Sequence, residues 1–472
     1  MQMTKETKLK IGKEILMVLA GLLVALLPAP KGLSQNAMTF LGIFVWAVLN
    51  WALPVMPPYV SGLLMLLLAV VFHIVPFKTA FSAFAGSTTW LIIGVLSLGS
   101  AVNKTGLLSR LSLSIMSLFP PTFRGQAAGL IGAGILIGPF MPSSTAKVSI
   151  AGGFATRIGE LLGFAPGSKG MNGIFAAMYT GFTLLAPAFI TSSYYSYLIL
   201  GTIPEEDASR FTFISWFLTM VPWTIFTALF AFLAISFLFR PDHAALMDKA
   251  EIRKMSKELG PMSADEKKTL LILGACVACW VLEKFTGVPA VIPALTGMCL
   301  LYMTGVLKPG EINSTINWGV IIFCSCIIGL VPIVSATGIN TWMADGIGNI
   351  MDSIGSNPCL FILAAAVIVI LSRLVLVAGT LVISLMVVIL TPFCQAAGMS
   401  PWVGGIIAYV LAQQFIFKYQ NANFLIAYEA AGGDEKLSHK DMIPYAMVYN
   451  IIATGGLFLS IPYWQYLGLI QG

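Results

Sequence analysis

Long runs without a charged residue alternate along the chain with short polar segments. The charge-free runs cover residues 32–77, 79–103, 125–146, 170–204, 211–239, 285–307, 312–344, 353–372, 374–417 and 442–472. A helix that spans a bilayer needs roughly 20 apolar residues, so each run can cross a membrane once, and the longest can cross twice or fold back. The pattern therefore predicts an all-α polytopic membrane protein with about eleven transmembrane helices.

The first apolar segment, residues 15–30, follows a basic lead that contains Lys5, Lys8, Lys10 and Lys13. A secretory signal has a similar pattern, but no convincing small-residue cleavage site follows, so we interpret the segment as the first helix. Further cations gather in the polar stretch 240–268, including Lys249, Arg253, Lys254, Lys257 and Lys267. Because cytoplasmic loops are enriched in Lys and Arg, we expect the N-terminus and this stretch on the cytoplasmic side of a bacterial inner membrane.

Composition fits this picture and excludes several classes of function. Hydrophobic residues make up 58% of the chain and charged residues 10%, so the solvent of most of the surface is membrane lipid. The net charge of +6 comes from the basic lead and the polar stretch, which indicates topology rather than nucleic-acid binding. Seven cysteines, an odd number, and three scattered histidines predict neither a disulfide framework nor a metal site, and we expect no cofactor.

The two halves of the chain share motifs in the same order at an offset of roughly 230 residues, which is the kind of internal repeat found in secondary transporters. The segment 87–90 matches 315–318, and 105–107 matches 337–339. Further along, the polar interruption 190–197 matches 418–425. We predict an N-terminal segment (1–34), a first repeat (35–240, with a re-entrant hairpin near 120–165), a cytoplasmic connector (241–268) and a second repeat (269–472, with a hairpin near 355–398).

One helix followed by five crossings places the connector on the cytoplasmic side, so the second repeat enters the membrane from the opposite face. The repeats are therefore expected to be inverted. Polar breaks at membrane depth are tolerated only where protein or a water-filled cavity satisfies the backbone. Inverted repeats with broken helices around a midplane site are typical of secondary transporters in which one unit moves past the other.

Each half contains a short motif at which an anion could bind. In the first half, Ser143, Ser144 and Thr145 precede a helical pattern, and Ala378, Gly379 and Thr380 occupy the matching place in the second. Helix N-termini offer free amides and a positive dipole end to a carboxylate, so two such tips would suit a ligand with two carboxylates. The alternative is that these residues only cap a helix. Four polar residues of the interruptions could also bind substrate or simply join helices, namely Ser192, Ser193, Asn421 and Asn423.

Three cations lie inside or at the edge of apolar runs: Lys147, Arg373 and Lys418. A charge in a membrane costs several kcal/mol and is usually kept for function. No acidic residue accompanies the three in these segments, which favours an anion cavity over a sodium or proton site. The alternative is that their long side chains extend to an interface.

These motifs, the paired broken helices and the closing segment 462–468 resemble the divalent anion/sodium symporter family. The resemblance covers nearly the whole chain and implies an elevator-type transporter, typically a homodimer in the membrane, for succinate, malate, fumarate, 2-oxoglutarate or a tricarboxylate such as citrate. In that family, two Ser-Asn-Thr tips hold the substrate carboxylates and sodium ions. Here both asparagines are replaced, by Ser144 and Gly379, and the serine of the second tip is Ala378.

The departure from the family motif suggests how transport is coupled. A fixed ammonium of Lys147 or Lys418 could take the place of sodium, so that the carrier crosses readily only when loaded and exchanges one dicarboxylate for another. A sodium-coupled symporter with carbonyl ligands remains the alternative, and an anion channel is a more distant one. A membrane-embedded enzyme is not expected, because no intramembrane Asp pair, HExxH or Gly-x-Ser-x-Gly motif occurs.

Overall fold

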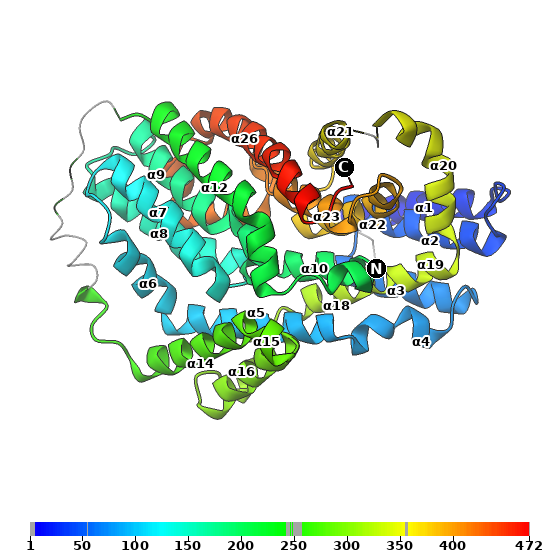
Figure 1. Cartoon of the computed structure of the whole chain (residues 1–472), viewed down its shortest axis with the longest axis horizontal. Helices are drawn as coiled ribbons and strands as arrows, with labels where there is room; N and C mark the ends of the chain where they lie inside the picture. The colour runs from blue at the N-terminus through cyan, green and yellow to red at the C-terminus, as the bar shows by residue number, and fades with distance from the viewer. Residues whose placement is uncertain are drawn as a thin grey trace.

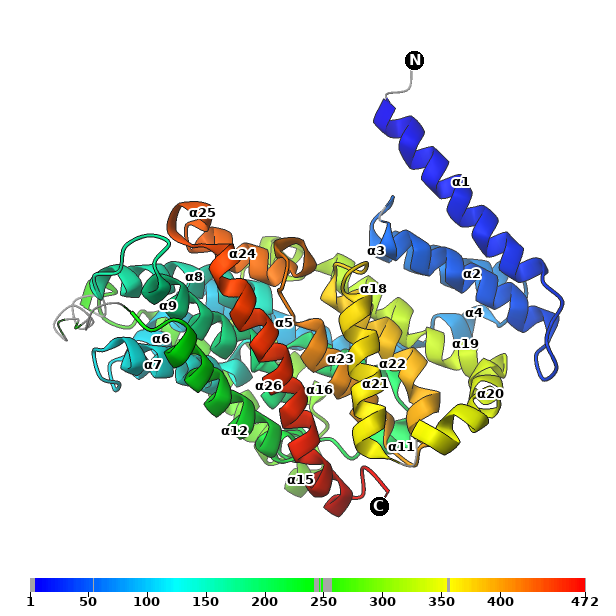
Figure 2. The same ribbon diagram turned by 90° about the horizontal axis from the view of Figure 1, so that it is seen from above.

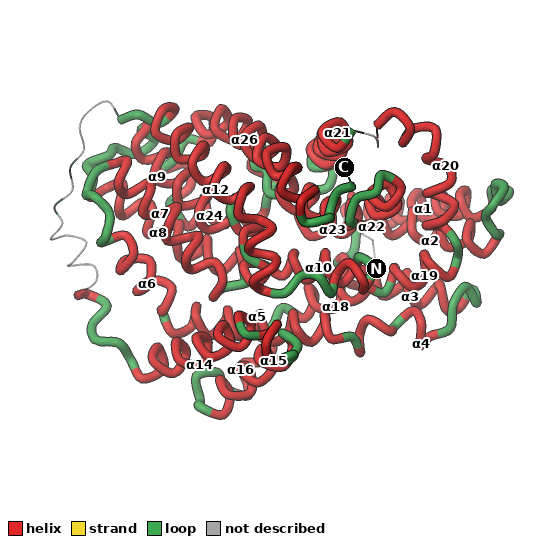
Figure 3. Tube along the Cα trace, viewed as in Figure 1, coloured by secondary structure: helices red, strands yellow, loops and turns green. Residues whose placement is uncertain are grey.

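The computed structural model describes residues 5–53, 55–241, 246, 248, 257–354 and 357–471. Much of the predicted connector, including Lys249, Arg253 and Lys254, lies outside these residues, as do residues 355 and 356 at the start of the second predicted hairpin. The described chain is helical throughout (Figure 3), and its β pairing consists of isolated bridges, Thr122 with Leu246 and Met399 with Ile470. The all-α prediction is confirmed.

The first half begins with helices that lead up to the predicted hairpin. They are α1 (Lys5–Leu26), α2 (Gln35–Ala52), α3 (Pro58–Val71), α4 (Phe77–Ala80), η1 (Ser82–Ala85), α5 (Ser87–Thr105) and α6 (Leu107–Met116). The hairpin and the broken segment after it contain α7 (Phe123–Ile137), η2 (Gly138–Phe140), α8 (Ser144–Leu161), α9 (Lys169–Tyr179), η3 (Thr180–Leu184), η4 (Ala186–Ala188), η5 (Ile190–Ser192) and α10 (Tyr194–Thr202). The half closes with α11 (Glu205–Ala208) and α12 (Phe213–Leu238).

The second half repeats this order of elements. Its leading helices are α14 (Ala264–Val281), α15 (Glu283–Thr286), α16 (Val291–Met303), η6 (Pro309–Glu311), α17 (Ile312–Thr315), α18 (Trp318–Ile328), α19 (Leu330–Ala336) and α20 (Ile339–Ile354). The hairpin and the second broken segment are α21 (Pro358–Ser372), α22 (Gly379–Ala396), α23 (Pro401–Ala412), η7 (Lys418–Gln420) and α24 (Ala422–Ala430). The chain ends with α25 (Gly433–Lys436) and the long α26 (His439–Tyr466).

The Thr-Gly motif that the sequence pairs between the halves is a helix break in both. Gly106 separates α5 from α6 with φ 79°, and Gly338 separates α19 from α20 with φ 71°. A left-handed backbone is unfavourable for residues with a Cβ, so glycine at both places lets the helix end and the chain turn. The shared motif thus has a shared conformation.

Membrane-spanning length is reached by only some of the described helices. Four segments are long and apolar enough to cross a bilayer: α12, α18 with α19, α22 and α26. The pair α5 and α6 is a further candidate, bent by 73°. Other apolar helices, such as α3 and α23, are shorter than the roughly 20 residues that a straight crossing requires, in keeping with interrupted segments. The count of about eleven crossings stays a prediction.

The helices gather in two groups with the broken segments between them. In Figure 1, α7, α8, α9 and α12 lie at one end, α1 to α4 with α19 and α20 lie at the other, and α10, α22 and α23 lie between. Figure 2 shows the same division and shows α1 extending away from the rest. The first hairpin helices α7 and α8 therefore belong to one end group, while α22 of the second hairpin lies between the groups.

A close approach of backbones holds the first broken segment against the first hairpin. A Cβ placed on Gly134 of α7 would lie 2.1 Å from the carbonyl carbon of Gly181 in η3, and one on Gly181 would lie 2.6 Å from the carbonyl oxygen of Leu130. Neither backbone can rotate out of the way as a side chain could. Glycine is therefore required on both sides of this contact.

We expect Gly134→Ala to destabilise the protein by about 1–3 kcal/mol, because overpacking at a fixed contact forces the backbone to shift. The measurement is the thermal midpoint of the detergent-purified protein, followed by size-exclusion chromatography. Gly132→Ala is the matched control on the same helix, since its Cβ would meet Phe119 Cζ at an ordinary 3.5 Å. Equal midpoints for the two variants would contradict this packing.

Candidate functional site

The first hairpin tip is the turn from η2 into α8. Ser143 is the N-cap of α8, and its hydroxyl accepts a hydrogen bond from the amide of Ala146 at 3.3 Å. Ser144 is buried, and its Oγ has no partner among the described residues, whereas Thr145 is exposed. The tip therefore has one hydroxyl that caps the helix, while the hydroxyl of Ser144 remains available to a ligand.

The first broken segment runs from Tyr179, the last residue of α9, to Ser193. It contains a π turn (η3) and two short 3₁₀ turns (η4 and η5), and it ends where Ser193 Oγ accepts a hydrogen bond from the amide of Tyr195 at 3.3 Å and caps α10. The hydroxyls of Thr191 and Ser192 are buried without a partner in the described chain. Buried hydroxyls of this kind, beside interrupted backbone, mark a place for a polar ligand or water.

The second hairpin tip differs from the first in its chemistry. α22 begins at Gly379, and its N-cap, Ala378, has no side-chain oxygen to accept from the first-turn amides. A Cβ on Gly379 would lie 3.2 Å from the hydroxyl oxygen of Tyr195, which is a tight contact. A side chain at position 379 would therefore require a small shift of the Tyr195 hydroxyl.

The second broken segment joins α23 to α24. Asn421 caps α24 by accepting hydrogen bonds from the amides of Asn423 at 3.0 Å and Phe424 at 3.3 Å, and its Nδ2 donates to the carbonyl of Gln413 at 2.9 Å. Asn421 thus has the place in this break that Ser193 has in the first. Both are residues that stabilise a helix N-terminus through a side-chain oxygen.

Each hairpin tip is joined by a hydrogen bond to the broken segment of the other half. Thr145 Oγ1 donates to Asn423 Oδ1 at 2.9 Å. The hydroxyls of Tyr194 and Thr380 are 2.7 Å apart. The two bonds connect residues 278 and 186 positions apart in sequence, so each tip contacts the opposite half of the chain. The sequence pattern missed Tyr194, although it lies within the tyrosine-rich interruption 190–197.

Lys147 lies in this region and is completely buried. Its ammonium donates a hydrogen bond to the carbonyl oxygen of Ser192 at 2.9 Å, which connects the first tip to the first broken segment. Among the described residues, no carboxylate forms an ion pair with it. A buried ammonium without a counter-ion is a position at which an anion is strongly favoured.

Arg373 is also completely buried and lies in the loop between α21 and α22. Its Nη1 donates to the carbonyl oxygens of Leu376 at 2.8 Å and Val377 at 2.5 Å, immediately before the second tip. Lys147 thus follows the first tip in sequence, and Arg373 precedes the second.

Lys418, the third cation singled out in the sequence, has a different environment. Its ammonium lies 2.5 Å from Asp434 Oδ1 and 4.4 Å from the centroid of the Tyr428 ring. The side chains of Lys418 and Asp434 are 32% and 78% exposed. Lys418 hydrogen-bonds the carboxylate and lowers the pKa of Asp434 below its ordinary value. The acidic partner Asp434 belongs to α25, which follows α24. Lys418 forms no hydrogen bond with either tip among the described residues.

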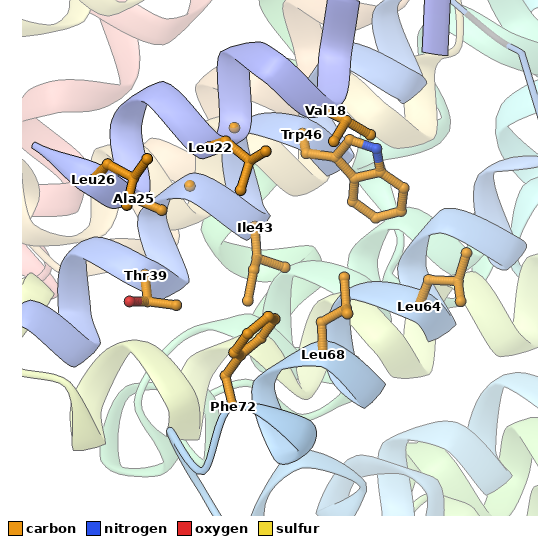
Figure 4. A pocket seen from close by; sticks show the side chains of 12 residues that line it. Val18, Leu22, Ala25, Leu26, Thr39, Ile43, Trp46, Leu64, Leu68 and Phe72 are labelled. Atoms are coloured by element: carbon orange, nitrogen blue, oxygen red, sulfur yellow. The ribbon is translucent and has the colours of Figure 1, made fainter. Parts of the chain in front are cut away.

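Two cavities bear on where a substrate could enter. One, with a volume of about 230 Å³, borders the second tip and is lined by Ala378, Thr380 and Leu381 together with residues of α3 and α18. The other, of about 490 Å³, lies between α1, α2 and α3 (Figure 4). Its lining is apolar apart from Thr39 and includes none of the candidate residues, so it does not suit a carboxylate.

The described residues contain no group of three or more His, Cys, Asp or Glu side chains that could hold a metal ion. What the region offers is hydroxyl groups, amides and two buried cations. Such donors can bind an anion and release it again.

Comparison with known proteins identifies relatives of this chain. The model of a family described as the sodium:sulfate symporter transmembrane region matches residues 8–470. The chain is 25% identical over 350 residues to the chloroplastic dicarboxylate transporter 1 of Spinacia oleracea, covering 72% of this chain and 61% of that protein. It is 24% identical over 356 residues to the inner membrane protein YbhI of Escherichia coli, covering 72% and 73% of the two chains.

A solved structure, Neisseria gonorrhoeae MtrF, has the same fold. Its TM-score with this chain is 0.58 at 14% sequence identity, and the match covers 95% of this chain and 94% of MtrF. The alignment with the Spinacia oleracea transporter spans less than two thirds of that protein's length.

Proposed function

The chain belongs to the sodium:sulfate symporter transmembrane-region family, and from that premise we propose that it exchanges small dicarboxylates across the membrane without sodium. The proposed substrates are C4 and C5 dicarboxylates such as succinate, malate, fumarate and 2-oxoglutarate, or a tricarboxylate such as citrate. The name of the Spinacia oleracea relative supports this substrate class. The relatives are transporters rather than enzymes, and this chain is an integral membrane protein.

The observation that carries the proposal is the position of Lys147. The ammonium is buried and bonded to the carbonyl of Ser192, between the first tip and the first broken segment. A carbonyl oxygen beside a helix tip is the kind of ligand that a sodium ion would use, and here a covalently fixed cation occupies that place. It can neutralise a substrate carboxylate but cannot dissociate into either compartment.

Exchange follows from the cost of moving the empty site. Without a substrate, Lys147 carries an uncompensated charge in a buried position, which is unfavourable by several kcal/mol. A bound dicarboxylate neutralises this charge and is held by the tips, so the loaded carrier crosses more readily than the empty one. The carrier therefore returns only with a second anion.

The movement we propose is an elevator-like shift of the tips and broken segments relative to the remaining helices, with the second repeat inverted relative to the first. The predicted repeat boundaries, 35–240 and 269–472, are part of this proposal. So are a homodimer, a location in a bacterial inner membrane and a cytoplasmic N-terminus.

A sodium-coupled symporter is the second candidate, because both broken segments contain interrupted backbone whose carbonyls could coordinate a cation. Polar side chains with atoms that have no partner among the described residues, such as Thr191 and Gln413, lie in these segments. In such a carrier, Lys147 and the coupling sodium ion would both help to neutralise the substrate carboxylates.

Competition of unlabelled anions against labelled succinate in proteoliposomes loaded with succinate tests the substrate class. We expect C4 and C5 dicarboxylates to compete at similar concentrations, while butyrate and sulfate compete at least about tenfold less well, since each lost charge-assisted hydrogen bond is worth about 1.5–3 kcal/mol. Competition by sulfate as strong as by succinate would refute a dicarboxylate carrier.

A further inference from the structure

Arg373 has hydrogen-bonding capacity that the folded chain leaves unused. The residue is completely buried, and while Nη1 donates to the carbonyls of Leu376 and Val377, Nε and Nη2 have no partner within the described residues. These atoms form one edge of the planar guanidinium, whose two parallel N–H groups match the two oxygens of a carboxylate. None of the ion pairs in the described chain involves Arg373.

A second buried donor without a partner among the described residues belongs to Tyr179, which interacts electrostatically with Arg373. The hydroxyl of Tyr179, at the end of α9, is buried and has no partner in the described part of the chain. Tyr179 and Tyr195 are both within electrostatic range of Arg373. The ring of Tyr179 is fixed by edge contacts with Phe415 and Phe424, with centroids 5.1 Å and 5.3 Å apart. The hydroxyl is therefore held in place while its bonding capacity stays free.

The second tip needs such donors more than the first tip does. The first tip offers Ser143, Ser144 and Thr145, whereas the second has Ala378 and Gly379 ahead of Thr380. Leaving three buried donors unsatisfied would cost about 1–3 kcal/mol each, and more for the charged group. A ligand that satisfies all of them at once is a planar anion with two acceptor oxygens.

We propose that the unpartnered Nε–Nη2 edge of Arg373, with the hydroxyl of Tyr179, binds one carboxylate of the substrate directly, at the second tip. This inference rests on the proposed function and goes beyond it, because it assigns one carboxylate to each half: Lys147 and the first tip bind one, and Arg373 and Tyr179 bind the other. The site then selects ligands with two carboxylates, since a monocarboxylate leaves one buried cation unneutralised.

The experiment measures binding of succinate and of succinamate, its monoamide, to the detergent-purified full chain by isothermal titration calorimetry. For Arg373→Gln we expect succinate affinity to fall about 10- to 100-fold, the size expected for a charge-assisted bidentate contact. The succinate affinity of Arg373→Lys should lie between those of Arg373→Gln and wild type, because lysine keeps the charge but lacks the two parallel N–H donors. For Tyr179→Phe, which keeps the ring, we expect a loss of about 3- to 10-fold for one hydrogen bond.

The preference for succinate over succinamate separates ligand binding from a structural role. If Arg373 only holds the loop between α21 and α22 in place, its substitution should weaken the binding of succinate and of succinamate by the same factor. If Arg373 binds a carboxylate, its substitution should reduce the preference for succinate over succinamate. Lys418→Gln is the matched control, because Lys418 is paired with Asp434, and we expect its affinities within twofold of wild type.

If Arg373→Gln fails to fold, the affinities of Arg373→Lys and Tyr179→Phe test the assignment, since both variants keep most native contacts. Succinate affinity and the preference for succinate within twofold of wild type in these variants would overturn the assignment. Wild-type protein that binds no dicarboxylate would instead overturn the proposed function.

Discussion

Replacing Lys147 with alanine should reduce succinate exchange about 10- to 100-fold, because a charge-assisted hydrogen bond to the substrate of about 1.5–3 kcal/mol is lost. Lys147 is buried and its ammonium is bonded to Ser192, so the substitution removes a cation from the middle of the proposed site. The measurement is the initial rate of labelled succinate uptake into succinate-loaded proteoliposomes.

Lys418→Ala is the control for this prediction. Both residues are lysines in or beside apolar runs, but Lys418 is paired with the exposed Asp434, and exposed pairs contribute only about 0–1 kcal/mol. We expect its exchange rate within about twofold of wild type for the same reason. An exchange rate equal to that of wild type in the Lys147→Ala variant would contradict the role proposed for the Lys147 ammonium.

Removing the hydroxyl of Thr145 should lower kcat/KM for exchange about 10-fold, since a part-buried hydrogen bond between two polar side chains is worth about 0.5–1.5 kcal/mol and its loss leaves Asn423 Oδ1 without this donor. Thr145→Val keeps the shape of the side chain and breaks the 2.9 Å bond that joins the first tip to the second broken segment. Because the bond connects the two halves, we expect its loss to act on the step in which the halves close around substrate.

The matched control is Ser149→Ala on the exposed face of the same helix. The hydroxyl of Ser149 donates only to the carbonyl of Ala146 within α8, at 3.0 Å, so exchange should stay at the wild-type rate. If Thr145→Val and Asn423→Ala each reduce exchange and the double variant is no worse than either, the two residues act through one bond. Additive losses would argue against it.

The sequence was sufficient to predict the helical class, the family and the paired helix breaks. Those features depend on local patterns: charge-free runs set the helices, Gly106 and Gly338 end them, and Ser143 and Asn421 cap the helices that follow. Such signals act within a few residues and can be read along the chain.

The partners of the polar side chains could not be predicted in the same way. Lys418 has the same sequence signal as Lys147, a cation at an apolar run, yet one is paired with Asp434 and the other is bonded to Ser192. The difference depends on a turn beyond α24 that brings an acidic residue back to the chain. Likewise, the approach of Tyr195 to Gly379 and of Tyr194 to Thr380 joins residues nearly two hundred positions apart, which periodicity does not encode.

The most direct test of sodium-independent exchange is the uptake of labelled succinate by proteoliposomes with and without internal dicarboxylate, in sodium and in potassium buffers. We predict uptake that requires internal dicarboxylate and is the same in both buffers, because the fixed ammonium of Lys147 replaces a coupling ion. Uptake into empty proteoliposomes driven by a sodium gradient would contradict the exchanger and establish the symporter instead.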